Sequence, residues 1–458
     1  MSKSYDVVVV GSGTAGQSAA YELNRKGLQV ALVEQSRQAG GTCALRGCQA
    51  KKWFYEGTEA VARSQHLAGI GITGVATASW RELRDAKNRF TAQVPESTVD
   101  GLKKAGIDYV EGHARFKGER LLEVDDSALS AHFVVVATGA VPMPLPIEGA
   151  ALMIDSSAFL ELERLPRRII FIGGGFISFE FAHFAARLGP PNTHCTILEA
   201  GPRPLGPFDG EMVRLLWEAS AQAGIDIHSD VSVTAIEKTA DAFAVVTEEG
   251  RRFEADLVVH GAGRSPDIDD LDLERAGVKH ARGGITVDEK MATTNPRIYA
   301  VGDCAATVQL ARVADAEAQV AADAIAGQIS DRPSDRVMDY AAVPAVLFTY
   351  PQYAMVGATE KTLEEKGVNY RKSAASHLTW PTYRRVGMTS AAYKLLADPN
   401  GMLLGAHIIS DNATGLINVC ALAMINQIPV DKLYRQSIMT PYPSRESDII
   451  YMLKPLIG

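Results

Sequence analysis

Two glycine-rich turns, each set between apolar strands, constrain the fold of this 458-residue chain more than any other feature. The first follows residues 5–10, a β-branched apolar run that is typical of a buried parallel strand. Gly11, Gly13 and Gly16 then form a G-x-G-x-x-G pattern that opens a helix, and the next strand ends at Glu34. This order of strand, glycine turn, helix and acid-ended strand is the βαβ unit that binds a dinucleotide.

Each residue of that pattern has a physical role. Gly11 permits a tight turn, Gly13 lets a pyrophosphate approach the backbone, and Gly16 lets the helix pack closely on the strand. The N-terminus of the helix faces the phosphates, and Glu34 accepts the ribose hydroxyls. With all parts in register, we expect a nucleotide site and not merely a flexible glycine-rich turn.

A second unit of the same kind lies in the middle of the chain. Gly173 and Gly175 supply its turn, and Ser178 takes the third glycine position, where its small side chain still allows close helix packing. The following strand ends at Glu199. Two units predict two dinucleotides, and an acid at this point favours NADH over NADPH. Arg203 nearby weakens that preference, so NADPH stays open as an alternative.

Cys43 and Cys48 are separated by four residues in the run GGTCALRGC, shortly after the first turn. In a reducing compartment such a close pair is more often a metal site or a redox couple than a structural staple. Structural zinc usually takes four ligands, and the chain has no second close cysteine pair. We expect Cys195, Cys304 and Cys420 to be core residues. Beside a nucleotide turn, the pair is therefore predicted to be redox-active, with no metal site.

Charge and hydropathy exclude several classes of function. The formal net charge is −8, and no basic tract suggests binding to nucleic acid or to an anionic membrane. The longest apolar runs have the length of strands, well short of a membrane span. The few residues before the first strand leave no room for a signal peptide. We expect a soluble, cytoplasmic, multi-domain α/β protein.

Six motifs along the chain resemble, in order, those of one enzyme family. They are GGTCALRGCQAKK, VVVATGAVP, GAGRSPD, TNPRIYAVGD, FTYPQYAMVGATE and GAHIIS. Over essentially its whole length the chain resembles the pyridine nucleotide–disulfide oxidoreductases, a family that includes glutathione reductase, dihydrolipoyl dehydrogenase and mercuric reductase. The resemblance implies an FAD-dependent enzyme that uses NADH, with NADPH as the alternative.

The resemblance also implies the domain organisation. The fold class is α/β, with two Rossmann-like dinucleotide-binding domains followed by a C-terminal α+β dimerisation domain that makes the protein a homodimer. The expected segments are an FAD-binding domain at 1–148, an NAD(P)-binding domain at 149–263, a second part of the FAD-binding domain at 264–336, and the interface domain at 337–458.

Carried over motif by motif, the resemblance implies two sets of cofactor-binding residues. The set expected to bind FAD is Gly11, Gly13, Gly16, Glu34, Gly41, Thr42, Thr138, Gly139, Gly302 and Asp303. The set expected to bind NAD is Gly173, Gly175, Glu199 and Gly263.

In the family, hydride passes from the nicotinamide to the flavin, and the flavin reduces the disulfide. The resemblance therefore implies a Cys43–Cys48 disulfide, with Cys48 nearest the flavin and Cys43 as the thiol that meets the acceptor. Lys52 matches the lysine that sits near the flavin, and Glu180 matches its carboxylate partner. A plain ion pair between domains is the alternative interpretation of Lys52 and Glu180.

One departure from the family concerns the C-terminal histidine–glutamate dyad that shuttles protons to disulfide substrates. Tyr442 takes the histidine position and Ser447 takes the glutamate position, with Glu446 and Asp448 on either side. A tyrosine of ordinary pKa near 10 is a poor base at neutral pH. The C-terminal cysteine pair of mercuric reductases is also missing, because no cysteine follows Cys420.

Three hypotheses follow. The leading one is an enzyme that passes electrons from NADH through FAD and the dithiol to an acceptor that needs no histidine base: a metal ion, a quinone or an unusual disulfide. The second is a dihydrolipoyl dehydrogenase or other disulfide reductase with a substitute base. The third is a non-enzymatic flavin redox sensor or a subunit of a larger complex.

Overall fold

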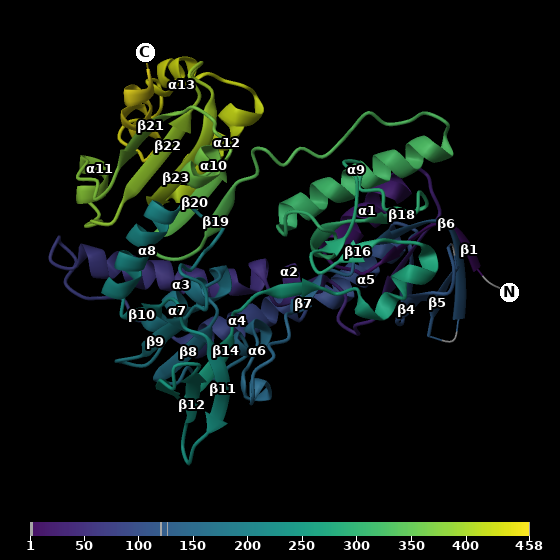
Figure 1. Cartoon of the computed structure of the whole chain (residues 1–458), viewed down its shortest axis with the longest axis horizontal. Coiled ribbons are helices and arrows are strands. Elements are labelled where there is room, and N and C mark those ends of the chain that lie inside the picture. Colours follow the sequence, from purple (N-terminus) through teal and green to yellow (C-terminus); the bar gives the residue numbers. More distant parts are fainter. Residues whose placement is uncertain (1–2, 120, 126, 458) are drawn as a thin grey trace. The chain divides into compact units, whose positions relative to one another are not determined.

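A computed structural model describes residues 3–119, 121–125 and 127–457, and the chain forms two compact units (Figure 1). The first unit comprises Met1–Trp53, Asp85–Pro144 and Gly263–Tyr340. The second comprises Phe54–Arg84, Leu145–Ala262 and Ala341–Gly458. The segments expected to form separate NAD(P)-binding and interface domains therefore lie in one unit, while the expected domain limits stay a prediction.

The first unit is built on a seven-stranded sheet in the order β3-β2-β1-β6-β5-β4, with β18 beside β6. Its strands are β1 (Lys3–Val10), β2 (Val30–Glu34), β3 (Asp108–Glu111), β4 (Ala114–Phe116), β5 (Leu121–Val124), β6 (Ser127–Val136) and β18 (Ile298–Ala300). Strands β3, β2, β1, β6 and β18 run parallel, and β4 and β5 continue the edge as an antiparallel pair.

The central strand β1 explains why this sheet has two cores. Val7 and Val9 point into one hydrophobic cluster, and Val8 and Val10 point into another, because side chains alternate along a strand. On the Val7 side, helices α1 (Thr14–Arg25) and α9 (Ala311–Ile329) pack against each other. A run of small β-branched residues therefore becomes a strand that is buried on both faces.

The second unit contains two larger sheets. The parallel sheet, in the order β10-β9-β8-β14, consists of β8 (Arg168–Ile172), β9 (His194–Leu198), β10 (Ile225–His228) and β14 (Leu257–His260). The antiparallel sheet, in the order β19-β20-β23-β22-β21, consists of β19 (Ala345–Leu347), β20 (Gln352–Gly357), β21 (Arg371–Ala375), β22 (Ala392–Ala397) and β23 (Leu403–Ser410). A three-stranded sheet is formed by β11 (Val233–Lys238), β12 (Phe243–Thr247) and β13 (Arg252–Ala255).

Helices cover both sheets of the second unit. Helix α7 (Phe176–Leu188) follows β8, and α8 (Gly210–Gln222) packs against β22 and β23 of the antiparallel sheet. Helix α12 (Ala413–Ile425) covers β20 and β23. The two parallel βαβ units and the C-terminal antiparallel sheet confirm the α/β fold class that the sequence predicts.

The chain leaves and re-enters the first unit through a pair of short strands. Strand β7 (Ala140–Pro142) pairs antiparallel with β15 (Arg264–Pro266), and the Met143 amide donates a hydrogen bond of 3.1 Å to the Gly263 carbonyl. The crossover and the return segment are thus hydrogen-bonded to each other within one unit.

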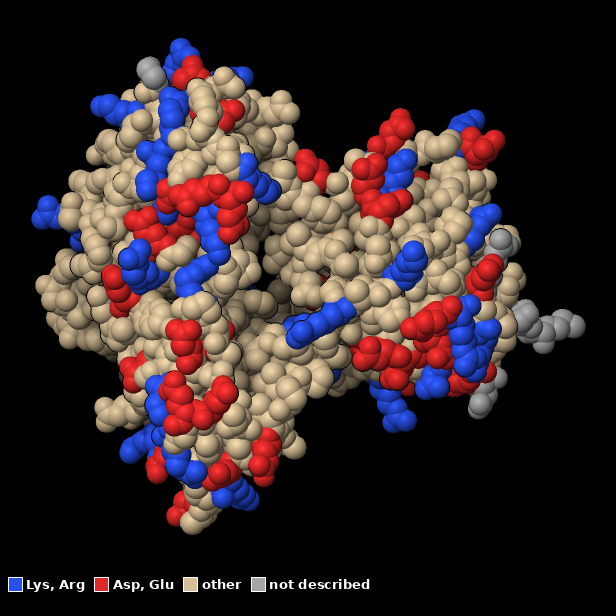
Figure 2. Space-filling view, in the orientation of Figure 1, with Lys and Arg blue, Asp and Glu red and all other residues tan. Residues whose placement is uncertain are grey.

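The distribution of charged side chains and the hydropathy of the helices both bear on whether the protein presents a membrane or nucleic-acid surface. Lys and Arg side chains are interspersed with Asp and Glu side chains over the face seen in Figure 2. Among the described residues, none of the helices is both long enough and apolar enough for a membrane crossing.

Candidate active site

The first glycine turn is shaped by close backbone contacts. Gly11 has a φ of +108°, and a Cβ atom there would lie 2.4 Å from the Ala137 carbonyl oxygen. A Cβ on Gly16 would lie 1.8 Å from the Gly11 carbonyl oxygen. Gly13 is different, because a Cβ there would meet only the Gly41 Cα, at 3.9 Å. The backbone at the start of α1 is therefore open, as the approach of a phosphate group requires.

Glu34 is held by the turn that it faces. Its Oε2 accepts hydrogen bonds from the Ser12 amide at 2.8 Å and from the Ser12 hydroxyl at 2.6 Å. Its Oε1 accepts one from the Ser36 amide at 2.7 Å. Ser12 is fully buried, and its Oγ also accepts a hydrogen bond of 3.0 Å from the Gly40 amide. Sequence reasoning missed Ser12, since a variable position of the glycine pattern carries no signal of its own.

The cysteine segment begins directly against this turn. Gly41 has a φ of +70°, and a Cβ there would lie 2.4 Å from the Gly13 Cα. Gly41 starts the short helix α2 (Gly41–Leu45), which carries Thr42 and Cys43. Only glycine at this position allows the segment to approach the open backbone of the nucleotide turn so closely.

Cys43 and Cys48 are present as thiols in contact with each other. Cys43 is half-buried, and its hydrogen bond to Cys48, followed by burial, raises the pKa of the Cys43 thiol. Cys48 is the first residue of α3 (Cys48–Leu67), where the helix N-terminus favours negative charge on sulfur. These effects favour the protonated form of Cys43. Lys52 follows Cys48 by four residues on the same face of α3.

The motif TNPRIYAVGD ends in a 3₁₀ turn, Gly302–Cys304, which follows β18. Burial raises the pKa of Asp303, and the positive charge of Arg264 opposes that rise. The buried Glu317 of α9 accepts hydrogen bonds from the Gly302 amide and from the Tyr340 hydroxyl, both at 2.7 Å. Glu317 is a second residue that sequence reasoning missed.

Thr138 and Gly139 follow β6, and Gly139 has a φ of +77° with open space where a Cβ would stand. The open backbone at Gly13 and Gly139, the oriented Glu34 and the turn that carries Asp303 all lie in the first unit, and we call this set the glycine-lined cradle. The residues present therefore fit a dinucleotide such as FAD.

The second glycine-rich turn, which we call the second fingerprint, has the same close backbone contacts as the first, but a serine takes its third glycine position. A Cβ on Gly173 would lie 2.4 Å from the Ala262 Cα, whereas a Cβ on Gly175 would meet only the Gly261 oxygen, at 3.3 Å. Ser178 replaces the third glycine, and its hydroxyl donates a hydrogen bond of 2.5 Å to the Gly173 carbonyl. Gly261 makes room for this side chain, because a Cβ there would lie 1.9 Å from the Ser178 Oγ.

Glu199, like Glu34, accepts hydrogen bonds from two backbone amides. Its Oε2 accepts a hydrogen bond from the Gly174 amide and its Oε1 one from the Gly201 amide, both at 2.6 Å. The guanidinium of Arg203 donates to the carbonyls of Phe208 at 2.9 Å and Gly206 at 2.8 Å. Arg203 therefore braces the loop after Glu199. Gly263 has a φ of +109° and lies in the first unit, where the chain returns from this region.

Glu180 is buried in α7, and its Oε1 accepts a hydrogen bond of 3.0 Å from the Phe348 amide. This bond joins α7 to the segment after β19 inside the second unit. Lys52 belongs to the first unit, so its pairing with Glu180 stays a prediction.

Tyr442 projects from the C-terminal segment, with 75% of its surface exposed. Ser447 does not support it. The Ser447 hydroxyl instead donates to the Ser444 carbonyl at 2.7 Å, and the Ser444 amide donates to the Ser447 oxygen at 3.0 Å. Ser447 closes the turn between these two serines and supplies no acid to Tyr442.

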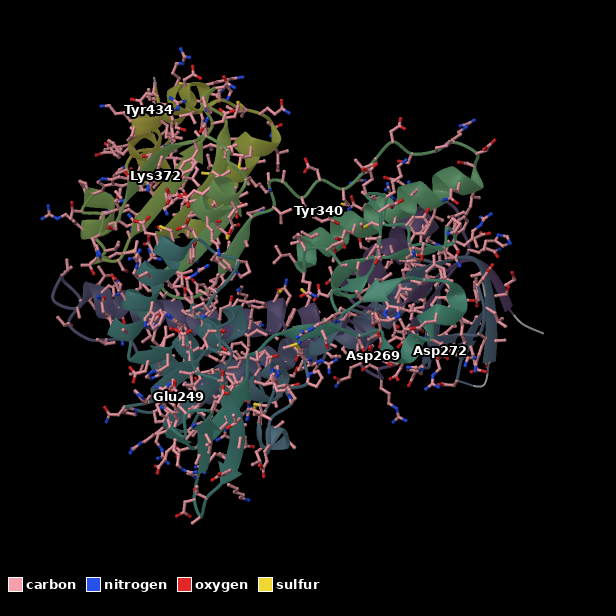
Figure 3. All side chains as sticks on the ribbon, viewed as in Figure 1. Glu249, Asp269, Asp272, Tyr340, Lys372 and Tyr434 are labelled. Atoms are coloured by element: carbon pink, nitrogen blue, oxygen red, sulfur yellow. The ribbon has the colours of Figure 1, made fainter. Side chains whose placement is uncertain are left out.

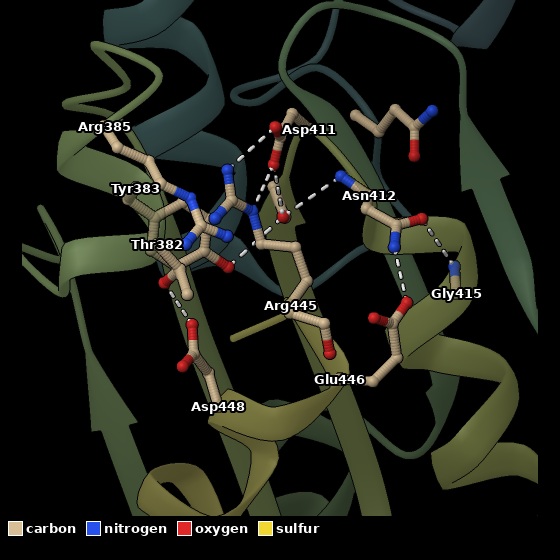
Figure 4. Close-up of polar contacts among 12 residues, drawn as sticks. Thr382, Tyr383, Arg385, Asp411, Asn412, Gly415, Arg445, Glu446 and Asp448 are labelled. Carbon is tan, nitrogen blue, oxygen red and sulfur yellow. Dashed lines mark hydrogen bonds and ion pairs between the residues drawn. The ribbon is translucent and has the colours of Figure 1, made fainter. Parts of the chain in front are cut away.

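A buried polar network fixes the residues that follow Tyr442 (Figure 4). The guanidinium of Arg445 donates to both carboxylate oxygens of Asp411, at 2.6 and 2.9 Å, and lies 4.2 Å from the centroid of the Tyr383 ring. This bidentate pair anchors the segment in the antiparallel sheet, because Asp411 directly follows β23.

The two acids beside Ser447 are also engaged in this network (Figure 4). Glu446 accepts a hydrogen bond of 2.6 Å from the Asn412 side chain. Asp448 accepts one from the Thr382 hydroxyl, and burial raises the pKa of Asp448. Both carboxylates therefore hold the C-terminal segment in place.

The remaining cysteines, Cys195, Cys304 and Cys420, are fully buried. Within residues 3–119, 121–125 and 127–457, no group of three or more His, Cys, Asp or Glu side chains is arranged to hold a metal ion.

Comparison with known proteins identifies relatives along the whole chain. Residues 5–318 match the family model described as pyridine nucleotide-disulphide oxidoreductase, and residues 343–448 match its dimerisation domain. A glutathione reductase of Burkholderia cepacia is 32% identical over 423 residues, which cover 92% of each chain. A mercuric reductase of Staphylococcus aureus is 30% identical over 94% of this chain and 78% of its own length.

A further sequence relative and a solved structure point to the same family. A dihydrolipoyl dehydrogenase of Chlamydia pneumoniae is 30% identical over 95% of this chain and 93% of its own. The HOCl-induced flavoprotein disulfide reductase RclA of Escherichia coli superimposes with a TM-score of 0.86 at 25% identity, covering 98% of this chain and 99% of its own, and RclA has also been solved as a Cu(II) complex. The chain belongs to the pyridine nucleotide-disulphide oxidoreductase family and is an FAD-dependent NAD(P)H oxidoreductase with a dimerisation domain.

Proposed function

We propose that this enzyme passes electrons from NADH through FAD and the Cys43–Cys48 pair to a metal ion, with copper(II) as the first acceptor to test. The observation that carries the proposal is the state of the C-terminal segment. An exposed Tyr442 stands at the histidine position, and Ser447, Glu446 and Asp448 are bonded elsewhere. An acceptor that takes electrons without a proton shuttle suits such a site.

The residues that would hold FAD are those of the glycine-lined cradle in the first unit, with Glu34 at the ribose and Asp303 at the ribityl chain. FAD, when bound, supplies the carrier that accepts a hydride from the nicotinamide and returns an electron pair to the disulfide. Cys48 is assigned the flavin side because its position at the start of α3 stabilises a thiolate. Cys43, whose protonated form is favoured beside Cys48, is assigned the acceptor side.

The proposed acceptor step balances without a protein base. The reduced pair, with Cys48 as the thiolate and Cys43 as the thiol, gives up two electrons and one proton and forms one sulfur–sulfur bond, while two copper(II) ions become two copper(I) ions. That proton passes to water, so no imidazole has to hold and return it. Two relatives favour metal ions as acceptors, since one is named a mercuric reductase and RclA has been solved with Cu(II).

NADH is the proposed coenzyme. Glu199 is held by two amides at the point where a ribose would lie, and a 2′-phosphate there would meet a fixed negative charge. Arg203, the nearby cation, is bonded to backbone carbonyls of its own loop. We expect kcat/KM for NADH to exceed that for NADPH, and a clear preference for NADPH would overturn this assignment.

A homodimer is the proposed assembly. Large apolar side chains are exposed on the C-terminal segment and on α12, namely Ile438 (57%), Met439 (84%), Leu422 (59%) and Ile425 (63%). Monomeric proteins rarely expose such groups together, and a second copy of the chain is the proposed cover. Tyr442 would then complete the site of the partner subunit.

The test is steady-state NADH oxidation by the FAD-loaded protein with separate acceptors: copper(II), mercury(II), a quinone, lipoamide and glutathione disulfide. We expect metal reduction that Cys48→Ser abolishes. Lipoamide and glutathione disulfide should turn over poorly, because general acid–base assistance is typically worth ~10²–10⁴-fold in rate. Efficient turnover of either disulfide would overturn the proposal and favour a disulfide reductase with a substitute base.

A gain-of-function variant sharpens this test. Tyr442→His places an imidazole on an exposed position, where the change should alter stability by only about 0.5 kcal/mol. If the missing base limits disulfide reduction, this variant should raise lipoamide turnover and leave copper(II) reduction nearly unchanged. Tyr442→Phe is the matched control and should change neither activity more than modestly.

A further inference from the structure

A buried lysine connects the antiparallel sheet to the loop that follows Glu199. Lys394 lies on β22 with only 2% of its side chain exposed. Its Nζ contacts three carboxylates: Asp209 at 2.9 Å, Glu211 at 2.8 Å and Glu360 at 2.5 Å. Hydrogen bonds to these acids raise the pKa of Lys394 against the effect of burial, so the lysine stays charged.

Asp209 is the end of the coenzyme loop, residues 199–209. It caps α8 by accepting hydrogen bonds from the amides of Glu211 and Met212, at 3.2 and 3.3 Å. It is 3% exposed, and Lys394 is the lysine bonded to it. A buried carboxylate is stable only when it is paired, so the position of Asp209 depends on Lys394.

The other end of the same loop is fastened to the glycine turn. Gly174 donates its amide to Glu199 at 2.6 Å and accepts a hydrogen bond from the Leu205 amide at 2.9 Å. Between these ends, Arg203 ties the loop to the carbonyl of Phe208, the residue before Asp209. These contacts form a continuous connection from Asp209 through Phe208 and Arg203 toward Glu199.

We propose that Lys394 is a positioning residue for the nicotinamide coenzyme: through Asp209 it fixes the loop that presents Glu199 to the ribose. This inference rests on the proposed use of NADH at the second fingerprint. It assigns to the antiparallel sheet, whose family role is to join subunits, a part in coenzyme binding by its own chain.

The test compares variants of the FAD-loaded full-length protein by calorimetric titration with NAD⁺, which needs no acceptor and no turnover. Lys394→Met should weaken NAD⁺ binding about tenfold, which corresponds to about 1.4 kcal/mol. With an active acceptor, KM for NADH should rise while kcat at saturation changes little, since only binding common to ground and transition states is lost. Lys394→Arg should restore most of the affinity.

Asp209→Asn guards against a variant that simply fails to fold. Asparagine caps a helix about as well as aspartate, so α8 keeps its cap while the charge facing Lys394 is removed. We expect weaker NAD⁺ binding here too. Lys372→Met is the matched control: Lys372, on β21 and labelled in Figure 3, is 46% exposed and contacts Glu360 at 2.9 Å, so its loss should leave NAD⁺ binding unchanged.

The outcomes separate the two proposals. If Lys394→Met and Asp209→Asn lower thermal stability but bind NAD⁺ as the unaltered protein does, Lys394 is structural only and the inference is overturned. If the unaltered protein binds NAD⁺ but reduces no metal ion, the proposed acceptor is wrong and the inference stands on the binding data. If the unaltered protein binds no NAD⁺ at all, both fail.

Discussion

The contact between Gly261 and Ser178 allows a prediction with a built-in control. A Cβ added at Gly261 would lie 1.9 Å from the Ser178 Oγ and 3.3 Å from its Cβ, while the nearest backbone atom, the Ile172 oxygen, would lie at 3.3 Å. Gly261→Ala therefore overlaps a single side chain, which is itself fully buried in α7 and bonded to the Gly173 carbonyl. The clash should disappear when that side chain is removed.

The expected free energies follow from this geometry. Gly261→Ala should destabilise the protein by about 2–3 kcal/mol, the usual cost of overpacking a rigid core. Ser178→Gly should cost about 1 kcal/mol for glycine inside a helix and about 1 kcal/mol for the lost hydrogen bond. In the double variant the overlap is gone, so it should lose only about 2 kcal/mol, which is about 2–3 kcal/mol less than the sum of the two single losses.

The assay is urea unfolding of the four FAD-loaded proteins, followed by far-ultraviolet circular dichroism. The coupling energy is a difference between parallel sides of the cycle, so contributions from the rest of the chain cancel. Calorimetric titration with NAD⁺ adds a functional reading, because Gly173 and Gly175 border the same contact. Strict additivity, with the double variant losing about 4–5 kcal/mol, would refute the view that Ser178 is accommodated by the missing Cβ of Gly261.

Three further predictions concern the first unit and the C-terminal segment. Cys43→Ser should keep or unmask a long-wavelength charge-transfer absorbance and Cys48→Ser should abolish it; the reverse pattern would exchange the two roles. Glu317→Gln should weaken FAD binding to the apoprotein about fivefold, because one buried hydrogen bond to the turn before Asp303 is worth about 1 kcal/mol, and an unchanged dissociation constant would contradict that role. Arg445→Met should cost ~3 kcal/mol, because the buried Asp411 carboxylate loses its bidentate partner and keeps a longer contact of 3.8 Å to Arg63. Adding Asp411→Asn should recover part of this loss; full loss in both variants would mean that the ion pair is not the cause.

Local pattern was enough to predict the framework. The valines of β1, the glycines at positions 11, 13 and 16 and the acid at the end of β2 are all signals carried by neighbouring residues. The same holds for the second fingerprint, including the exchange to Ser178. For such units the sequence period and the turn chemistry agree with the fold, and both the α/β class and the family are confirmed.

The buried polar side chains that position the cofactor turns and the C-terminal segment could not be predicted from local pattern. Lys394 and Asp209 are 185 positions apart, and Arg445 and Asp411 are 34 apart. Each lies in an ordinary local pattern, a lysine in a strand or an arginine after a serine, and its burial depends on which distant acid the fold brings near. Ser12 and Glu317 were missed for the same reason, since each accepts a hydrogen bond from a backbone amide, that of Gly40 or of Gly302, which no residue type reveals.

The paired amides on Glu34 and Glu199 have a consequence for the evolution and redesign of coenzyme choice. At each site one oxygen takes the amide of the second residue of the fingerprint and the other takes the amide two residues after the acid. Replacing Glu199 by a cation to attract a 2′-phosphate would leave both amides without their acceptor, in a loop whose conformation depends on them. A change from NADH, the proposed coenzyme, to NADPH would therefore require a new way to close residues 199–209, because the same carboxylate serves coenzyme selectivity and the folding of the loop.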